Sequence, residues 1–431
     1  MSNAAPTAAR PAADRATAST GGVTLLVLLG ALTAIGPLSL DMYLPAFPAM
    51  TRDLGAGQAG IQLSLTTCLI GLALGQLVTG PLSDRWGRRR PVLVGVVAYT
   101  VLALACAAAP NAPLLAAARF AQGVAGGMGV VVARAVVRDL YSGRDAAKYF
   151  SRLTLVFGVA PVAAPGVGSL VLRFGSWRAV FVALAVIGAV LAVAVALRLP
   201  ETLPAERRST GGLGATVRTM RSLLADRVYL GYALTQGFAF AGLFAYISGS
   251  SFVFQDVFGV SAAVFSVIFG VNALALVAVG QANARLLDRF TPRRLLVTTL
   301  AVGLVTAIGV LSGALAGSLA VTAVALFAFV GSLGMVMPNS TALALDAHAR
   351  HAGTAAALMG GIQSVVGALA APLVGLGGEG SALPMAVVLA GAAFLSLTAV
   401  VTLAAPERGA DGSREAGGHP GAGGHGGGAA R

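Results

Sequence analysis

The sequence is poor in charge. Charged residues make up 10% of its 431 residues, whereas hydrophobic residues make up 57% and the mean hydropathy is +0.84. A water-soluble protein of this length carries about 25% charged residues on its surface and in its loops. The composition therefore excludes an ordinary soluble globule and predicts a polytopic membrane protein.

Lysine, cysteine and histidine are also scarce. Lys148 is the one lysine, and no Gly-rich phosphate loop ending in Gly-Lys-Ser/Thr is present, which excludes ATP as the energy source. Cys68 and Cys106 both fall in apolar runs and predict neither a disulfide nor a zinc site. The four histidines lie between apolar runs or in the tail, and His419 and His425 have no neighbouring ligands. We therefore expect no enzyme, no metal and no cofactor; a receptor or scaffold is the remaining non-enzyme alternative.

Long apolar runs dominate what is present. We count twelve, each near the ~20 residues that a helix needs to cross a bilayer core of about 30 Å. A polar stretch divides them into two sets of six. The predicted organisation is a disordered tail, a first bundle, a linker, a second bundle and another disordered tail, at residues 1–22, 23–198, 199–225, 226–404 and 405–431.

The basic residues are concentrated in the segments on one side of the membrane. A net charge of +13 could indicate nucleic-acid binding, but the basic residues form short clusters between apolar runs rather than one soluble face. Every basic residue except Arg52, Arg119, Arg173 and Arg178 falls in segments that alternate to the same side of the membrane. The positive-inside rule places those segments and both termini in the cytoplasm.

One basic stretch, GPLSDRWGRRR from Gly80 to Arg90, lies between two apolar runs and is predicted to be the loop that joins them. Gly80 and Gly87 would let the backbone turn tightly. Asp84 either balances the local arginines or locks this loop against a neighbouring helix end.

The stretch resembles the loop signature of the major facilitator superfamily in its residues Gly80, Leu82, Asp84, Arg85, Gly87, Arg88 and Arg89. The resemblance implies an all-α membrane protein with twelve transmembrane helices in two six-helix bundles. It also implies a cytoplasmic gate that includes Gly80, Asp84, Arg85, Gly87 and Arg88, in which the aspartate helps to hold the halves together in the outward-facing state.

Two spans of the first half carry charge. The first contains Asp41 within LDMYLP, among Pro37, Pro45 and Pro48, and such a helix is expected to bend beside a cavity. The fourth contains Arg119 and Gln122 on one face, and Gly123 and Gly127 on a face suited to close helix contact.

A buried arginine is costly and is a functional candidate, although it could instead extend to the outer interface. RFAQGVAGGMG resembles the fourth-span signature of the superfamily, whose arginine is implicated in proton movement. Counting 1.5 Å per residue puts Asp41 and Arg119 at the same depth, so we predict that they form the proton-coupling pair. The alternative is that Asp41 caps the outer helix end.

The fifth span contains Gly158, Pro161 and Pro165 in GVAPVAAPGVGS, which resembles the signature of the drug-exporting antiporters. The resemblance places these residues at the junction between the halves, as gating residues. A closely packed helix is the alternative.

The second half repeats the first weakly, since Gly280-Gln281 and Asp288-Arg289 echo Gly75-Gln76 and Asp84-Arg85. The stretches at Phe244–Ser261, Pro338–Leu345 and Ala352–Gln363 resemble the Bcr/CflA group of drug-resistance transporters. The resemblance implies proton-coupled efflux of small amphipathic drugs by a monomer in the cytoplasmic membrane. The alternative is a proton-coupled transporter of a single metabolite, such as a sugar, nucleoside or amino acid.

Polar and aromatic residues on otherwise apolar spans are the candidate substrate contacts, although each could instead bridge two helices. They are Tyr43, Gln122, Gln236, Phe240, Tyr246, Asn272, Asn339 and Gln363.

Overall fold

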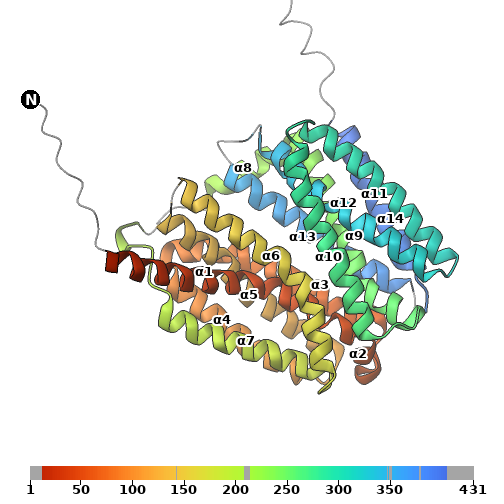
Figure 1. The fold of residues 1–431 in the computed structure, drawn as a ribbon, viewed down its shortest axis with the longest axis horizontal. Coiled ribbons are helices and arrows are strands. Elements are labelled where there is room, and N and C mark those ends of the chain that lie inside the picture. The colour runs from red at the N-terminus through yellow and green to blue at the C-terminus, as the bar shows by residue number, and fades with distance from the viewer. Residues whose placement is uncertain are drawn as a thin grey trace, which may run out of the picture.

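Two helical bundles lie side by side in the computed structural model (Figure 1). The structure describes residues 12–141, 143–207, 214–346, 348, 352–377 and 380–404. The first bundle consists of α1 (Ala12–Asp41), η1 (Leu44–Ala46), α2 (Phe47–Leu54), α3 (Gln58–Trp86), α4 (Arg89–Ala107), α5 (Ala112–Leu140), α6 (Gly143–Leu172) and α7 (Trp177–Arg198). The linker contributes η2 (Ala205–Arg207) and α8 (Gly214–Ala225). The second bundle consists of α9 (Arg227–Phe252), η3 (Val253–Val257), α10 (Ala262–Leu286), α11 (Pro292–Leu315), α12 (Leu319–Asp346), α13 (Ala352–Leu376) and α14 (Leu383–Thr402).

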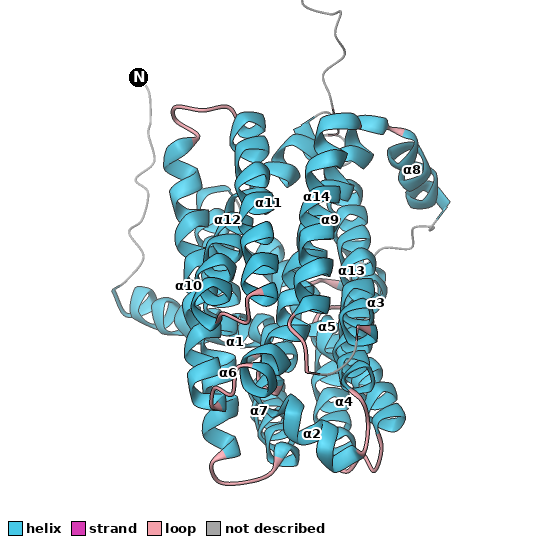
Figure 2. Cartoon of the chain, turned by 90° about the vertical axis from the view of Figure 1, so that its right-hand side faces the viewer, coloured by secondary structure: helices cyan, strands magenta, loops and turns pink. Residues whose placement is uncertain are grey.

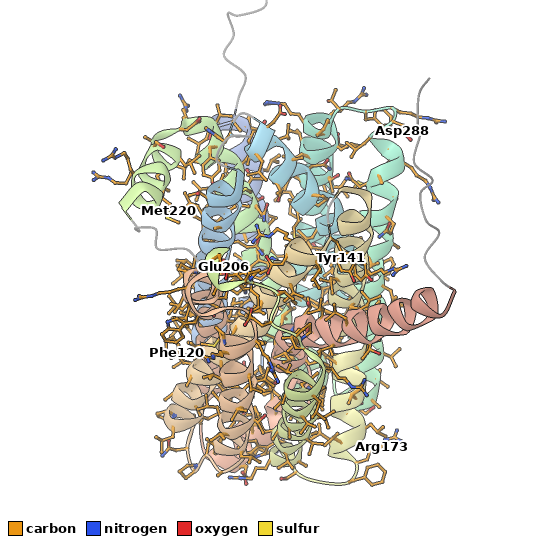
Figure 3. All side chains as sticks on the ribbon, turned by 90° about the vertical axis from the view of Figure 1, so that its left-hand side faces the viewer. Phe120, Tyr141, Arg173, Glu206, Met220 and Asp288 are labelled. Carbon is orange, nitrogen blue, oxygen red and sulfur yellow. The ribbon has the colours of Figure 1, made fainter. Side chains whose placement is uncertain are left out.

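The membrane-spanning helices come close to the predicted number of twelve. Among the described residues, 11 helices are long and apolar enough to cross a bilayer, and Gly158–Leu172 of α6 is a shorter apolar helix. Every regular element of the described chain is helical (Figure 2). Arg173, after α6, and Asp288, after α10, lie at opposite ends of the molecule (Figure 3). The predicted fold of two six-helix bundles is confirmed.

Glycines bring α3 and α5 into backbone contact. A Cβ added at Gly71 or Gly75 of α3 would lie 2.1 Å from the carbonyl oxygens of Phe120 or Val124. In the reverse direction, a Cβ at Gly123 of α5 would lie 2.2 Å from the Cys68 oxygen. On each helix the glycines are four residues apart and lie on one face, so the two helices form one tight seam. In lipid, van der Waals contact of this kind replaces the hydrophobic effect as the force between helices.

The second bundle has the corresponding seam. A Cβ at Gly334 of α12 would lie 2.2 Å from the Leu276 oxygen of α10. Since α10 and α12 occupy the places that α3 and α5 hold in the first bundle, the weak sequence repeat corresponds to a structural repeat.

The first span is broken where the sequence predicted a bend. α1 ends at Asp41, a turn follows, and η1 and α2 complete the crossing. Pro45 and Pro48 cannot donate to the carbonyls of Asp41 and Leu44, so the α-helical ladder stops there. α1 also begins earlier than predicted, at Ala12 rather than Val23, in a stretch rich in alanine, the strongest helix former.

The predicted loop after α3 is shorter than expected. α3 continues to Trp86, so Gly80 lies inside the helix and the prediction of a turn at Gly80 is wrong. Gly87 alone makes the turn, with φ at +89°, a backbone conformation that favours glycine. The tail at residues 405–431, with its two histidines, lies outside the described residues.

Candidate functional site

The two bundles are joined by hydrogen bonds that gather at the end opposite the linker. Ser251 Oγ donates to the Leu44 oxygen at 2.6 Å, and Gln255 Nε2 donates to the Pro45 oxygen at 3.2 Å. The Leu44 carbonyl is available because Pro48 has no N–H for it. The break in the first span thus provides acceptors for the second bundle.

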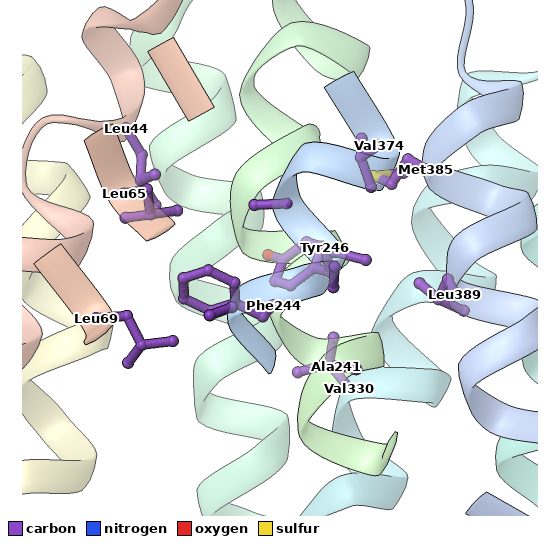
Figure 4. Close-up of a cluster of buried hydrophobic side chains, with 14 of the residues drawn as sticks. Leu44, Leu65, Leu69, Ala241, Phe244, Tyr246, Val330, Val374, Met385 and Leu389 are labelled. Carbon is purple, nitrogen blue, oxygen red and sulfur yellow. The ribbon is translucent and has the colours of Figure 1, made fainter. Parts of the chain in front are cut away.

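Further bonds of this kind link other helices at the same end. They are Gln62 Nε2 to the Ser248 oxygen, Thr66 Oγ1 to the Ala368 oxygen and Ser266 Oγ to the Pro165 oxygen, at 3.1, 3.3 and 3.0 Å. Figure 4 shows a cluster of buried apolar side chains from both bundles, with Leu44 and Leu65 on one side and Phe244 on the other. In this conformation the bundles are held together away from the linker.

The α6 helix lies at this junction. It packs against α10, and a Cβ added at Gly158 would lie 3.4 Å from Cγ2 of Val277. The helix runs continuously through Pro161 and Pro165. Gly158 and Pro165 of the antiporter-like stretch therefore lie against the second bundle, whereas Gly168 lies against Met42 of the first.

Arg119 is the centre of a polar group inside the first bundle, here called the arginine cluster. It is 0% exposed. Its Nη1 donates to Gln122 Oε1 at 2.6 Å and its Nη2 to the Ser39 oxygen at 2.6 Å. The guanidinium lies 4.5 Å from the ring centroid of Tyr43 and 5.6 Å from that of Phe181, which stabilises the cation without a counter-ion. Complete burial excludes an arginine that extends to the interface.

Two donors of the arginine cluster are unused. Arg119 Nε and Gln122 Nε2 are buried and have no hydrogen-bond partner. The hydroxyls around them are paired, Tyr43 with Ser64 at 3.1 Å and Ser39 with Tyr99 at 2.7 Å. A buried unpaired donor costs about 1–3 kcal/mol, so the cluster is suited to donate hydrogen bonds to a further oxygen atom.

Asp41 does not contact Arg119, and the predicted ion pair is absent from this structure. Asp41 is 4% exposed, and no hydrogen bond or ion pair reaches it within the described part of the chain. The reason is the helix break: the carboxylate sits at the end of α1, while the guanidinium is held by the Ser39 carbonyl and by aromatic rings. A carboxyl buried in this way is not explained by a helix-capping role.

Another polar group belongs to the second bundle and is built around the buried Tyr246 phenol, which is 2% exposed. Asn272 Nδ2 donates to the Tyr246 hydroxyl at 3.0 Å, and the ring of Tyr246 stacks on Phe269 with centroids 5.3 Å apart. We call Tyr246, Phe269 and Asn272 the interbundle cluster, because the Tyr246 hydroxyl lies on the side of the ring toward Leu44 and Leu65 of the first bundle (Figure 4).

A third group, the glutamine cluster, joins three helices of the second bundle. Gln236 Nε2 donates to Gln363 Oε1 at 2.6 Å, and Thr341 Oγ1 donates to Gln236 Oε1 at 2.9 Å. The structure thus brings together two of the predicted substrate residues, from α9 and α13.

The other two predicted substrate residues of the second bundle lie apart from these groups. Asn339 donates to Asn283 Oδ1 at 2.7 Å and is 1% exposed, so in this conformation it bridges α12 and α10. The ring of Phe240 stacks on that of Phe244, with centroids 5.9 Å apart. It packs against the backbone of Gly367 and fills the space that a side chain there would occupy.

A charged cluster occupies the linker end of the first bundle. Arg88 Nε donates to Asp139 Oδ2 at 2.8 Å, and Arg88 Nη1 donates to Asp84 Oδ1 at 2.6 Å. Burial of the Arg88 guanidinium disfavours its charge, but the bonds to Asp139 and Asp84 outweigh burial and raise the pKa of Arg88 above its ordinary value. The Glu201 carboxylate accepts from the backbone N–H groups of Arg88 and Arg89 at 2.8 and 3.2 Å, which caps α4.

Asp84 therefore balances local charge in this conformation and contacts no described residue of the second bundle. Sequence reasoning missed Asp139 and Glu201. An acid in the last turn of a span, directly after Arg138, was the available signal for Asp139.

Replacing Asp139 by Asn is expected to destabilise the protein more than replacing Asp84 by Asn. The Arg88 side chain is 6% exposed and Asp139 16%, so Asp139→Asn leaves a buried cation short of its partner, at a cost of about 3 kcal/mol. The Asp84 side chain is 49% exposed, and its loss should cost less than about 1 kcal/mol. Unfolding in denaturing detergent measures both, and equal losses would contradict this assignment.

The Major Facilitator Superfamily model matches residues 29–372 of the chain. The chain is 41% identical over 373 residues to an uncharacterized MFS-type transporter, YdgK, of Bacillus subtilis, covering 85% of this chain and 92% of the relative. It is 31% identical to a bicyclomycin resistance protein homolog of Haemophilus influenzae, covering 87% and 94%. It is 30% identical to multidrug resistance protein D of Escherichia coli, covering 80% and 86%.

Solved structures share the fold at low identity. A bacterial homolog of the human lysosomal transporter Spinster, inward-facing and unoccupied, aligns with a TM-score of 0.70 and 18% identity, covering 89% of this chain and 97% of that one. The Escherichia coli xylose transporter XylE, partially occluded and inward-open, aligns with a TM-score of 0.68 and 11% identity, covering 90% and 99%.

Proposed function

Because the chain belongs to the major facilitator superfamily and is therefore a multi-pass membrane transporter, we propose that it exports small amphipathic drugs in exchange for protons. The names of its relatives support drug efflux, since bicyclomycin and multidrug resistance are stated for proteins that align with most of this chain. The cytoplasmic membrane, with both termini in the cytoplasm, is the location that the distribution of arginines favours.

The observation that carries proton coupling is the buried carboxyl of Asp41. It lies at the end of α1, where the first span breaks, is 4% exposed, and has no hydrogen-bond partner among the described residues. An ionised carboxylate is expensive in such a place, so its charge is sensitive to which side admits water. Asp41 is proposed to bind a proton from outside and release it inside. The positive charge of Arg119 in the same bundle is proposed to favour the ionised form of Asp41 and so its release of the proton.

The direction of opening follows from the contacts between bundles. Those contacts lie at the end opposite the linker, which the arginine distribution makes the outer end. The conformation is then closed outside, and the Arg88 cluster lies at the inner end. There the 49% exposed Asp84 side chain is proposed to meet the second bundle when the inner end closes. Gly158, Pro161 and Pro165 are proposed to guide the motion of α6 against α10.

The substrate is proposed to bind between the bundles, near the interbundle and glutamine clusters. Tyr43, Gln122, Phe240 and Asn339 remain candidate contacts in other conformations. A transporter closed outside exposes this region to the cytoplasm, from which an exporter takes its substrate.

A susceptibility panel in an efflux-deficient host tests the export of drugs. Expression of the chain should raise the inhibitory concentration of several structurally unrelated neutral or cationic compounds, and a proton uncoupler should abolish the gain. Asp53→Asn offers a matched control because Asp53 is an exposed acid whose partners lie within the first bundle; its carboxylate accepts from Trp177 Nε1 at 2.8 Å. Resistance to no compound at normal expression would contradict the proposal.

A further inference from the structure

Three neutral side chains from three helices of the second bundle form a hydrogen-bonded chain. Thr341 Oγ1 of α12 donates to Gln236 Oε1 of α9 at 2.9 Å, and Gln236 Nε2 donates to Gln363 Oε1 of α13 at 2.6 Å. Gln363 Nε2 stands at the end of this chain, and no described residue accepts a hydrogen bond from it. The chain therefore has a free N–H donor at its Gln363 end.

The side of α9 that carries Gln236 is the side that meets the first bundle farther along the helix. Gln236, Phe240, Phe244 and Ser251 follow one another at helical spacings, so they lie on one face. Ser251 Oγ donates to a carbonyl of the first bundle, and Phe244 points toward Leu65 of that bundle in Figure 4. Gln236 makes no hydrogen bond to the described residues of the first bundle, although it lies on the same face. It therefore faces the boundary where the bundles are apart.

The α13 helix shows the same opening. Gly375 and Gly361 are separated by nearly four helical turns and lie on the same side of the helix. A Cβ at Gly375 would lie 2.6 Å from Cα of Ala59 in the first bundle, whereas a Cβ at Gly361 would meet nothing within 4 Å. The bundles thus separate between these two levels, and the partly exposed Gln363 lies at the level of the opening.

No fixed charge on the three helices decides which way the two amides point. Within these helices α9 has no charged residue after Arg227, α12 has none before Asp346, and α13 has none. A half-turn of both amide groups exchanges their oxygen and nitrogen atoms, and Gln363 then donates to Gln236, which donates to the Thr341 hydroxyl. Both arrangements contain the same two hydrogen bonds. The second presents the Gln363 carbonyl to the opening in place of its N–H groups.

We propose that Thr341, Gln236 and Gln363 act as a reversible hydrogen-bonded chain through which the site binds neutral molecules. The chain meets an acceptor group of the molecule in one arrangement and a donor group in the other. Phe240, which follows Gln236 on the same face and stacks on Phe244, supplies an apolar surface beside it. Chemically unlike neutral compounds can then bind without a change of the backbone. This inference rests on the proposed export of drugs and names the substrate class of that site.

Three tricyclic molecules of nearly the same shape test the chain. Carbazole carries an N–H donor, fluorenone carries a carbonyl acceptor, and fluorene carries neither. Binding of each tritiated probe to the purified protein in nanodiscs would be measured by scintillation proximity, with empty nanodiscs subtracted. Export of each probe from cells that express the chain would be measured separately.

The wild type is expected to bind carbazole and fluorenone about three to ten times more tightly than fluorene, which is the gain from one hydrogen bond. Gln363→Met should remove both gains and leave the affinity for fluorene unchanged, because methionine fills a similar space without an amide. Thr235→Val is the matched control and should change none of the three affinities. Thr235 is 0% exposed, and its hydroxyl donates to the Gly231 oxygen at 2.8 Å within α9.

Gln236→Glu tests whether the chain reverses. An ionised carboxylate only accepts hydrogen bonds, so at alkaline pH it should accept from both Gln363 and Thr341 and leave the Gln363 carbonyl facing the opening. Carbazole should then keep its gain and fluorenone should lose it, which changes the ratio of their affinities by about threefold to tenfold. Fluorene reports the effect of the new charge alone.

Other outcomes overturn the inference in distinguishable ways. Equal affinities of the wild type for the three probes, or gains that survive Gln363→Met, would remove the chain from recognition. An unchanged ratio in Gln236→Glu would make Gln363 a contact of fixed orientation and contradict reversal. Binding in the expected pattern without export of any probe would overturn the proposed function and leave the binding site in place. Export without this pattern would overturn the inference alone.

Discussion

Vesicles that contain the Asp41→Asn variant are expected to lose export driven by a pH gradient, down to the level of empty vesicles. Asn matches Asp in size but binds no proton in the accessible pH range, so the step that links proton entry to the return of the carrier is removed. Exchange of substrate at equal pH should persist, because the bundles can still open and close around bound substrate.

The control for this prediction is the exposed acid Asp53, at the end opposite the linker. Asp53→Asn removes a carboxylate that is 47% exposed and paired with Arg178, and gradient-driven export should be retained. Uphill export by Asp41→Asn at the wild-type rate would place the proton-binding group elsewhere.

Gly75→Ala is expected to have the largest effect on stability. The added Cβ would lie 2.1 Å from the Val124 carbonyl oxygen, which is backbone and cannot rotate away, so α3 and α5 must separate. Separation opens the seam that also includes Gly71, Gly123 and Gly127, at a cost of about 3 kcal/mol.

Gly80→Ala is the matched control on the same helix. Nothing lies within 4 Å of a Cβ at Gly80, so alanine should be neutral or stabilise by up to about 1 kcal/mol through its helix propensity. Unfolding in denaturing detergent gives both values. Similar stabilities of the two variants would show that the seam does not hold the bundle together.

The number of spans and their division into two sets of six were predictable from the sequence, because each run had to be long and apolar enough to cross a bilayer. The close approach of Gly123 and Gly127 to another helix was also predictable from their spacing. The partner helix was not, since glycines on α3 could equally have packed against another span.

The helix boundaries at special positions were harder to predict. Prolines at positions 45 and 48 indicated a bend, but whether the chain bends or breaks depends on partners such as Ser251 for the freed carbonyls. Gly80 resembled a turn residue, yet the helix continues past it to Trp86. The turn lies at Gly87 instead, where Arg88 is bound by Asp139 and Glu201.

The candidate site was predicted residue by residue but not as an arrangement. Depth along two helices placed Asp41 and Arg119 at one level, and depth alone gives no direction around the helix axis. The structure turns Arg119 toward Ser39 and Tyr43, and leaves Asp41 buried at the end of α1 without a hydrogen-bond partner among the described residues. Contacts between residues that are about two hundred positions apart in the sequence require the packed bundles.

The central claim is that substrate leaves in exchange for protons, and simultaneous measurement of both fluxes tests it most directly. Wild-type protein would be reconstituted in liposomes that hold a pH-sensitive dye, and a transported drug would be added without any imposed gradient. The account predicts that drug movement in one direction drives protons in the other, and that Asp41→Asn moves no protons while it still exchanges drug. Drug movement by the wild type with no change in the dye signal would contradict it.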